Sequence, residues 1–328
     1  MGCGRDGVYN RAVTLPGSET SVAIPRKRGR LRWWAWHIAR VGVLAYLGVC
    51  IVVYSIQNSY VFPGAAATQG QKDGSISQDY NDKLLALRTQ SGTPIVALFG
   101  KALQPSGAAL ADASHRPTII YFYGNGACMA YSTDVFESFR RLGANVIIPD
   151  FEGYGMSGGK PSEMGCYAAA NAAYDYLLKR DDIDSKLIVA IGWSLGAASA
   201  IELAYTRPVA GVVTVSAFTS LRDMAHQFIP WLPMSLIMRY RFDNLSKVAE
   251  ISCPMLIVHG TEDELVPLAM AGRLAAAAKG KATRYNVIGG GHNDVFKVGG
   301  IALLDQISKF LDGIVTSQAK APIRPAAE

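Results

Sequence analysis

The run Gly-Trp-Ser-Leu-Gly at residues 192–196 restricts the possible folds of this chain more than any other feature. It follows the β-branched stretch Leu187–Ile191 and precedes an alanine-rich segment typical of a closely packed helix. Glycine on either side of the serine permits a tight turn from strand to helix, where any side chain would clash. Such a turn would expose the oxygen of Ser194 at the carboxyl edge of a sheet, as a nucleophile requires.

Short apolar runs alternate with helical patterns along most of the chain. The candidate strands are residues 118–123, 146–150, 186–193, 211–216, 255–260 and 284–288, and the candidate helices are 131–142, 162–180, 195–206 and 269–278. Continuous β-branched runs separated by helices predict a mostly parallel sheet with helices on both faces. The predicted fold class is therefore α/β.

A serine hydroxyl becomes a competent nucleophile when a base removes its proton, and the base needs an acid to orient it. The strand at 255–260 is followed by three candidate acids, Glu262, Asp263 and Glu264, and the strand at 284–288 by a glycine-rich loop that carries His292. Both loops would lie at the same sheet edge as Ser194. We expect Ser194, His292 and one of the three acids to act together. Among the acids, the shorter side chain favours Asp263.

Of the five histidines, only His292 lies in a loop at the expected position. His259 lies within a strand and is expected to pack in the core. His226 belongs to an insert, His115 precedes a strand, and His37 lies in the apolar N-terminal segment. The sequence therefore favours His292 as the base.

Acyl transfer also needs two backbone N–H groups that stabilise the developing oxyanion. We expect one from Leu195, directly after the nucleophile, and the other from Asn125 in the Gly-Asn-Gly turn after the strand at 118–123. The alternative is that the glycines of this turn only shape the chain.

The N-terminal part of the chain predicts a membrane anchor. Residues 1–32 form a basic, polar tail, and residues 33–56 begin with a tryptophan cluster and end in an uncharged apolar run. Their 24 residues suffice to cross a hydrocarbon core of about 30 Å. Basic residues before the segment indicate a cytoplasmic N-terminus and a catalytic domain on the extracytoplasmic side, the periplasm in a bacterium. A signal peptide cleaved after Ala67 is the alternative, but that site lies far beyond the apolar run.

Charge and cysteine content exclude several classes of function. Residues 1–40 hold eight basic and two acidic residues, which accounts for the whole net charge of +6, so the main domain is neutral and offers no nucleic-acid surface. The five cysteines are widely spaced without a C-x-x-C pair, which argues against a zinc site or a disulfide framework. We expect neither a metal nor a cofactor.

Over about residues 57–311 the chain resembles the membrane-anchored, serine-aminopeptidase-like branch of the α/β-hydrolase superfamily, which includes depalmitoylating and lysophospholipid-cleaving hydrolases. The resemblance rests on the motifs at residues 58–63, 124–126, 149–163, 192–196, 241–244 and 253–267. It implies the α/β-hydrolase fold, with Ser194, Asp263 and His292 at the triad positions and Asn125 and Leu195 at the oxyanion positions.

Two residues depart from the pattern of this branch. Tyr123 stands where histidine usually precedes the oxyanion turn, and Glu152 stands where arginine is usual. Neither is a triad position, so the departures bear on the shape and polarity of the substrate entrance.

The expected domain organisation is a linker or domain entry at 57–80, a catalytic domain at 81–314 and a flexible tail at 315–328. Residues 218–244 interrupt the strand–helix rhythm with an apolar, proline-broken stretch, which in this fold commonly forms a lid over the site. An ordinary core helix is the alternative.

Together these features predict a serine hydrolase of carboxylic esters or thioesters of lipid-like or acylated small molecules. A serine peptidase or amidase is the second hypothesis, and an inactive membrane scaffold is the third. The sequence leaves the acyl-chain length and the oligomeric state open.

Overall fold

A computed structural model of the protein describes residues 28–69 and 83–320. The chain divides into two units, residues 1–53 and residues 54–328. The helix α1 (Arg28–Val61) runs from the first unit into the second. Within the described residues, one helical stretch, Arg32–Val61, is long and apolar enough to cross a membrane by length and composition.

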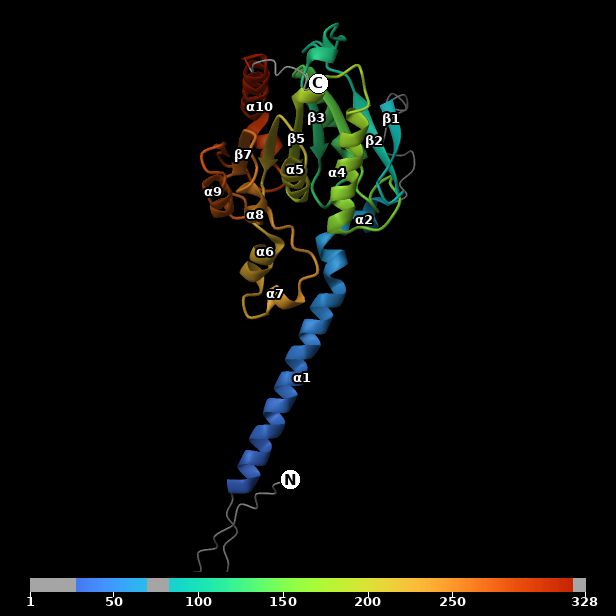
Figure 1. Ribbon diagram of the computed structural model, residues 1–328. Helices are drawn as coiled ribbons and strands as arrows, with labels where there is room; N and C mark the ends of the chain where they lie inside the picture. The colour runs from blue at the N-terminus through green and yellow to red at the C-terminus, as the bar shows by residue number, and fades with distance from the viewer. Residues whose placement is uncertain (1–27, 70–82, 321–328) are drawn as a thin grey trace, which may run out of the picture. The chain divides into compact units, whose positions relative to one another are not determined.

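The second unit contains a single sheet with helices around it (Figure 1). Its strands are β1 (Leu84–Arg88), β2 (Pro94–Gly100), β3 (Thr118–Phe122), β4 (Asn145–Pro149), β5 (Ile188–Trp193), β6 (Gly211–Val215), β7 (Met255–Gly260) and β8 (Ala282–Val287). Its helices are α2 (Pro63–Thr68), α3 (Thr133–Arg141), α4 (Glu163–Leu177), α5 (Leu195–Thr206), α6 (Leu221–Phe228), α7 (Met234–Ile237), α8 (Asn244–Val248), α9 (Leu268–Ala277) and α10 (Val295–Lys320).

The strands that the described residues contribute lie in the order β1-β2-β4-β3-β5-β6-β7-β8. The pairs β1/β2 and β2/β4 are antiparallel and all later pairs are parallel. The central strands β3, β4 and β6 are buried at every residue, as strands covered on both faces must be. This architecture confirms the predicted α/β fold with a mostly parallel sheet.

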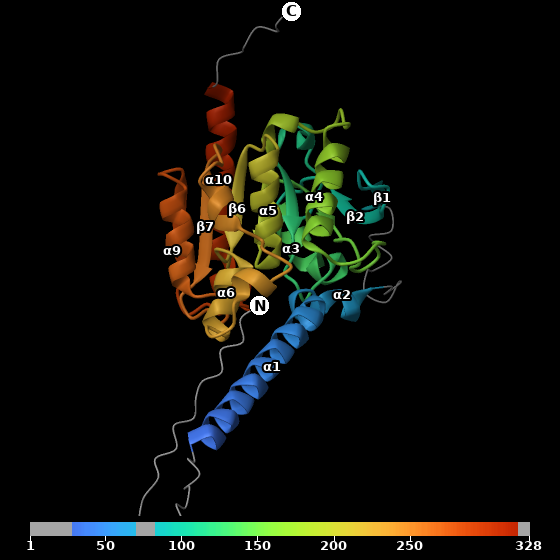
Figure 2. The same cartoon turned by 60° about the horizontal axis from the view of Figure 1, so that its bottom comes forward.

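Helices cover both faces of the sheet (Figure 2). On one face, Tyr121 of β3 packs edge-on against Phe139 of α3 and Phe296 of α10, with ring centroids 5.6 and 6.4 Å apart. Helices α4 and α5 cover the opposite face. The α5 helix packs closely because it is rich in alanine, and Ala197, Ala198 and Ala200 are fully buried.

The structure differs from the sequence-based expectations mainly at the two ends of the catalytic domain. The six predicted strands are present as β3–β8, with ends shifted by at most two residues, and β1 and β2 were not predicted. Residues 295–320, at the end of the domain, form α10, which buries Ile314 and extends to Lys320 within the segment expected to be a flexible tail.

Residues 57–69 belong to the segment expected to be a linker or the entry into the domain, and they are largely helical and packed. Pro63 occupies the first turn of α2, where its missing N–H costs no hydrogen bond. Phe62 is 1% exposed, and its ring lies edge-on to Tyr240 with centroids 4.9 Å apart. The hydroxyl of Thr68 donates to Gly64 O (2.7 Å) and accepts from Gly155 N (3.0 Å). This segment is therefore an integral part of the folded unit.

Replacing Phe62 with alanine tests this packing. Removing a buried aromatic side chain should lower the free energy of unfolding by about 3–5 kcal/mol. Urea unfolding of the full chain in detergent micelles, followed by tryptophan fluorescence, measures the loss. Tyr60→Ala, at a neighbouring side chain that is 75% exposed, is the control and should change stability by less than about 0.5 kcal/mol. Equal, small effects of both variants would contradict the packing.

Candidate active site

The turn between β5 and α5 places Ser194 at the end of the strand and directly before the helix. Ser194 has φ 54° and ψ −115°, a strained conformation for a residue with a side chain. A Cβ atom on Gly192 would lie 2.1 Å from Gly196 O, and one on Gly196 would lie 2.1 Å from Phe122 O. The two glycines are therefore required by direct backbone contact, and they permit the strained turn.

The structure brings Ser194, His292 and Asp263 together in one chain of hydrogen bonds. His292 Nε2 lies 2.9 Å from Ser194 Oγ, and His292 Nδ1 lies 2.9 Å from Asp263 Oδ2. All three residues are buried, with exposed fractions of 8–9%. Ser194 follows β5, Asp263 follows β7 and His292 follows β8. The strands β5, β6, β7 and β8 are neighbours and run parallel, so the loops that follow them meet at one edge of the sheet. This arrangement can pass the serine proton to the imidazole.

Burial separates Asp263 from the two competing glutamates, which are both exposed. Asp263 Oδ1 accepts hydrogen bonds from Leu265 N (3.1 Å) and Val266 N (2.7 Å). Burial alone would raise the pKa of Asp263, but the hydrogen bonds from His292 and Val266 N–H outweigh it and lower the pKa. The carboxylate therefore stays ionised beside His292.

His259, predicted only to pack in the core, also contacts Asp263. It is fully buried, as expected for a core histidine, and its Nε2 lies 2.8 Å from Val266 O and 3.4 Å from Asp263 Oδ2. Burial lowers the pKa of His259, so its neutral form dominates. Because a carbonyl only accepts, the proton is on Nε2. In the sequence, only the spacing of four residues between His259 and Asp263 pointed to this contact.

A cavity of about 220 Å³ opens at Ser194. Its lining comes from the Gly-Asn-Gly turn, the end of β5 and the histidine loop: Gly124, Asn125, Gly126, Ala127, Trp193, Ser194, His292 and Asn293. Leu195 is the first residue of α5, where backbone N–H groups have no partner within the helix. The geometry thus places both expected oxyanion residues beside the serine.

Trp193 lies at the site, although no role was predicted for its side chain from the sequence. Its side chain lines the cavity, and its Nε1 donates a hydrogen bond to His292 O at 3.2 Å. The indole therefore connects the nucleophile turn to the histidine loop.

The first departure from the family pattern, Tyr123, directly precedes the oxyanion turn, is fully buried and does not line the serine cavity. Its buried hydroxyl donates to Asp150 Oδ1 (2.9 Å) and accepts from Phe151 N (3.0 Å). Asp150 also accepts from Met129 N and Met156 N, at 2.7 and 2.9 Å. Burial raises the pKa of Asp150 to about 6, although these three hydrogen bonds oppose the shift.

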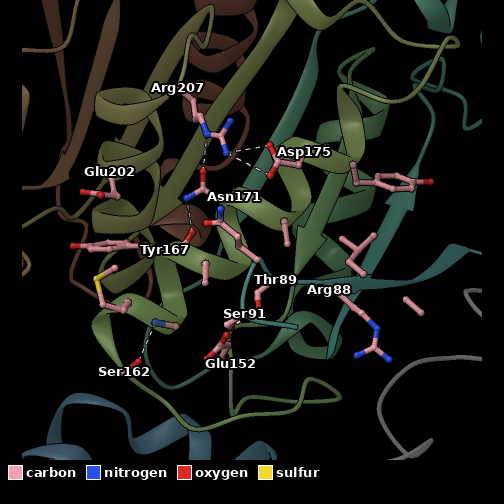
Figure 3. A pocket seen from close by; sticks show the side chains of 18 of the residues that line it. Arg88, Thr89, Ser91, Glu152, Ser162, Tyr167, Asn171, Asp175, Glu202 and Arg207 are labelled. Atoms are coloured by element: carbon pink, nitrogen blue, oxygen red, sulfur yellow. Dashed lines mark hydrogen bonds and ion pairs between the residues drawn. The ribbon is translucent and has the colours of Figure 1, made fainter. Parts of the chain in front are cut away.

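The second departure, Glu152, lines a different cavity, of about 800 Å³, along α4 (Figure 3). Figure 3 shows Arg207 directed at Asn171 and Asp175, to which it is bonded at 2.8 and 3.1 Å. Neither Ser194 nor His292 lines this cavity. The structure therefore places both departures away from the entrance to the serine cavity.

The buried Asp150 predicts a pH-dependent term in stability. A carboxyl whose pKa rises from 3.8 in the unfolded chain to about 6 in the fold adds stability below pH 3.8 and loses it as the pH rises through 6. Asp150→Asn removes this titration. Its unfolding free energy relative to wild type should therefore increase by about 2 kcal/mol between pH 4 and pH 7. Urea unfolding at several pH values measures this difference, and a difference independent of pH would contradict the assignment.

Comparison with known proteins gives a family match and two informative relatives. A family model described as alpha/beta hydrolase fold matches residues 117–236. The alpha/beta hydrolase domain-containing protein WAV2 of Arabidopsis thaliana is 30% identical over 302 residues, covering 85% of this chain and 94% of that protein. An uncharacterized protein of Mycobacterium tuberculosis, Rv2307c, is 36% identical over 196 residues, covering 60% of this chain and 69% of that protein.

Solved structures share the fold at lower identity. The esterase Pf2001 of Pyrococcus furiosus matches with a TM-score of 0.60 and 18% identity, covering 75% of this chain and 97% of that one. A puromycin-hydrolyzing peptidase of Mycobacterium tuberculosis matches with a TM-score of 0.54 and 18% identity, covering 71% and 40%. Among these structural neighbours are thus both an esterase and a peptidase.

Proposed function

The chain belongs to the α/β-hydrolase family, and we propose that it is a serine hydrolase with Ser194 as nucleophile, His292 as base and Asp263 as acid. The observation that carries this proposal is the pair of 2.9 Å contacts that His292 makes, through Nε2 to Ser194 Oγ and through Nδ1 to Asp263 Oδ2. Both distances are within hydrogen-bond reach, as nucleophile activation demands.

In the proposed reaction, His292 Nε2 takes the serine proton while Ser194 Oγ attacks the substrate carbonyl carbon. The carbonyl oxygen becomes an oxyanion, which the N–H groups of Leu195 and Asn125 stabilise. The imidazolium then protonates the leaving alkoxide or thiolate, which departs and leaves an acyl-enzyme. Water, deprotonated by His292, attacks the acyl carbon, the bond to Ser194 Oγ breaks as the carboxylic acid leaves, and the imidazolium returns its proton to Ser194 Oγ. Asp263 remains ionised and holds the imidazole in the required tautomer.

We favour a carboxylic ester or thioester as the bond that is cleaved. Pf2001, whose chain is matched almost completely, is an esterase by its name. In addition, the insert at residues 218–244 carries exposed apolar side chains such as Phe228 and Leu236, which suit an acylated substrate. We further propose that the chain is anchored by α1, with its N-terminus in the cytoplasm and the catalytic unit on the other side.

An amide is the second candidate bond, because a puromycin-hydrolyzing peptidase shares the fold. Turnover of short-chain and long-chain esters by the full chain, measured beside aminoacyl amides, separates the two. Cleavage of the esters with a kcat/KM at least about tenfold higher would support the first candidate, a difference of about 1.4 kcal/mol in the barrier. Cleavage of amides alone would refute it.

A fluorophosphonate probe tests the nucleophile directly, because an activated serine displaces fluoride from its phosphorus. Wild-type protein should be labelled, and Ser194→Ala should not. His292→Ala should slow labelling and lower kcat by about 10⁴–10⁶-fold, since the serine then lacks its base. Gel fluorescence and mass spectrometry of the labelled peptide measure the outcome.

The matched control is His115→Ala, which removes a histidine that lines a separate cavity with Asp112 and Leu311. It should label at the wild-type rate. Equal labelling of wild type and Ser194→Ala, or loss of labelling in the control alone, would refute the proposed site.

A further inference from the structure

The last two turns of α1 are hydrogen-bonded to the insert at residues 218–244, here called the cap. Gln57 is 4% exposed, and its Nε2 donates to Ile237 O (2.8 Å) while its Oε1 accepts from Arg239 N (2.7 Å). The hydroxyl of Tyr240 donates to Asn58 Oδ1. Because both polar ends of the Gln57 amide bond to cap backbone, this contact fixes the position of the cap relative to residue 57.

The same stretch of chain is bonded to the oxyanion turn. Val61 O accepts a hydrogen bond from Asn125 Nδ2 (3.4 Å), and Gly64 N donates to Asn125 O (2.9 Å). A Cβ atom on Gly64 would lie 2.4 Å from Asn125 O, so the two backbones are in direct contact. The end of α1 therefore contacts two elements that surround Ser194, namely the cap and the wall that contains Asn125.

The sequence of α1 fixes where this contact would lie relative to a membrane. The uncharged apolar run ends at Ile56, and the candidate membrane span ends at Val61. Tyr54 and Tyr60, near its end, are residue types that prefer the boundary between lipid and water. Since one helical turn advances about 5.4 Å, Gln57 and Val61 would lie within about one turn of that boundary.

The cap carries large apolar side chains with a high exposed fraction: Phe228 and Trp231 are each 60% exposed, and Leu236 is 83% exposed. Exposed Arg239 and Arg241 follow them in sequence. Apolar side chains next to arginines suit the boundary of a bilayer, where the former enter the acyl region and the latter meet phosphates. The cap and α2 lie at the same end of the sheet in both views (Figure 1, Figure 2).

The size of the serine cavity is compatible with a substrate that is delivered from lipid. Its volume of about 220 Å³ is below the range of about 300–1,000 Å³ that is usual for ligand pockets. It can hold the reacting carbonyl group and its neighbouring atoms, and the rest of a long acyl chain must remain outside it. A chain that stays partly in lipid meets this requirement.

We propose that Phe228, Trp231 and Leu236 of the cap enter the lipid leaflet from which α1 emerges, so that Ser194 receives acyl lipids directly from the bilayer. The choice of substrate rests on the proposed hydrolase function. The docking of the cap on lipid does not rest on that function, because it is inferred only from the contacts of Gln57 and Asn125 and from the apolar surface of the cap.

Site-specific fluorescence tests the docking. The full chain with Leu236→Cys, in a background with Cys3→Ser and Cys253→Ser, is labelled with a nitrobenzoxadiazole dye and reconstituted into phosphatidylcholine vesicles. The matched control is Ile301→Cys, on α10, where the native side chain is 87% exposed. We expect a blue shift and at least twofold quenching by doxyl-labelled lipid at position 236, and neither effect at position 301.

Aqueous emission at both positions would overturn the proposal. A blue shift at position 236 without quenching by doxyl lipid would also overturn it, because a second copy or another protein would then cover the cap. Fluorophosphonate labelling of the same samples reports on the hydrolase separately. A lipid-quenched dye on an unlabelled protein would thus retain the docking and remove the proposed function.

Turnover tests the consequence for substrate delivery. In the variant Phe228→Ser, Trp231→Ser, Leu236→Ser, we expect the ratio of vesicle-embedded long-chain ester turnover to soluble short-chain ester turnover to fall at least tenfold. The ratio corrects for any general loss of active enzyme. An unchanged ratio would contradict delivery from the bilayer.

Discussion

The start of α5 and the ends of β3 and β5 approach so closely that no side chain fits between them. Gly192 and Gly196 meet this requirement, since a Cβ atom on either would lie 2.1 Å from a backbone oxygen. The hydrogen bond from Ser194 N to Val215 O (2.9 Å) fixes the turn to the next strand. Because this turn is held by backbone contacts on both sides, Ser194 keeps a strained conformation at the sheet edge to which the acid and histidine loops also come.

The partners of the serine are held by equally local devices. Val266 is bonded through its N–H to Asp263 and through its carbonyl to His259, so the acid loop closes on itself. Trp193 connects the serine turn to the histidine loop. Asp150 is bonded to the Tyr123 hydroxyl before the oxyanion turn and to Met129 N after it, so it ties together the two segments that flank the turn. Each loop at the edge of the sheet thus has its own buried support, which explains how three separate segments meet within hydrogen-bond distance.

The central strands and the loop positions of Ser194 and His292 could be predicted because continuous apolar runs and glycine turns are local signals. The strand β1 escaped prediction because it is an edge strand whose residues are mostly exposed or half-buried. The strand β2 was missed although residues 95–99 form a continuous apolar run that is mostly buried. The shorter side chain and the family resemblance favoured Asp263 over its glutamate neighbours, and in the structure burial, which no local pattern reveals, separates it from them. The contact of Gln57 with Ile237 joins residues 180 positions apart, so it could be found only in the folded structure.

The central claim is that acyl transfer passes through Ser194. Rapid acid quenching of the full chain during turnover of a long-chain thioester, followed by peptide mass spectrometry, tests it most directly. The account predicts a mass increase equal to the acyl group on the peptide that contains Ser194, which disappears once the substrate is consumed. Steady turnover with acylation of a different residue would contradict the account.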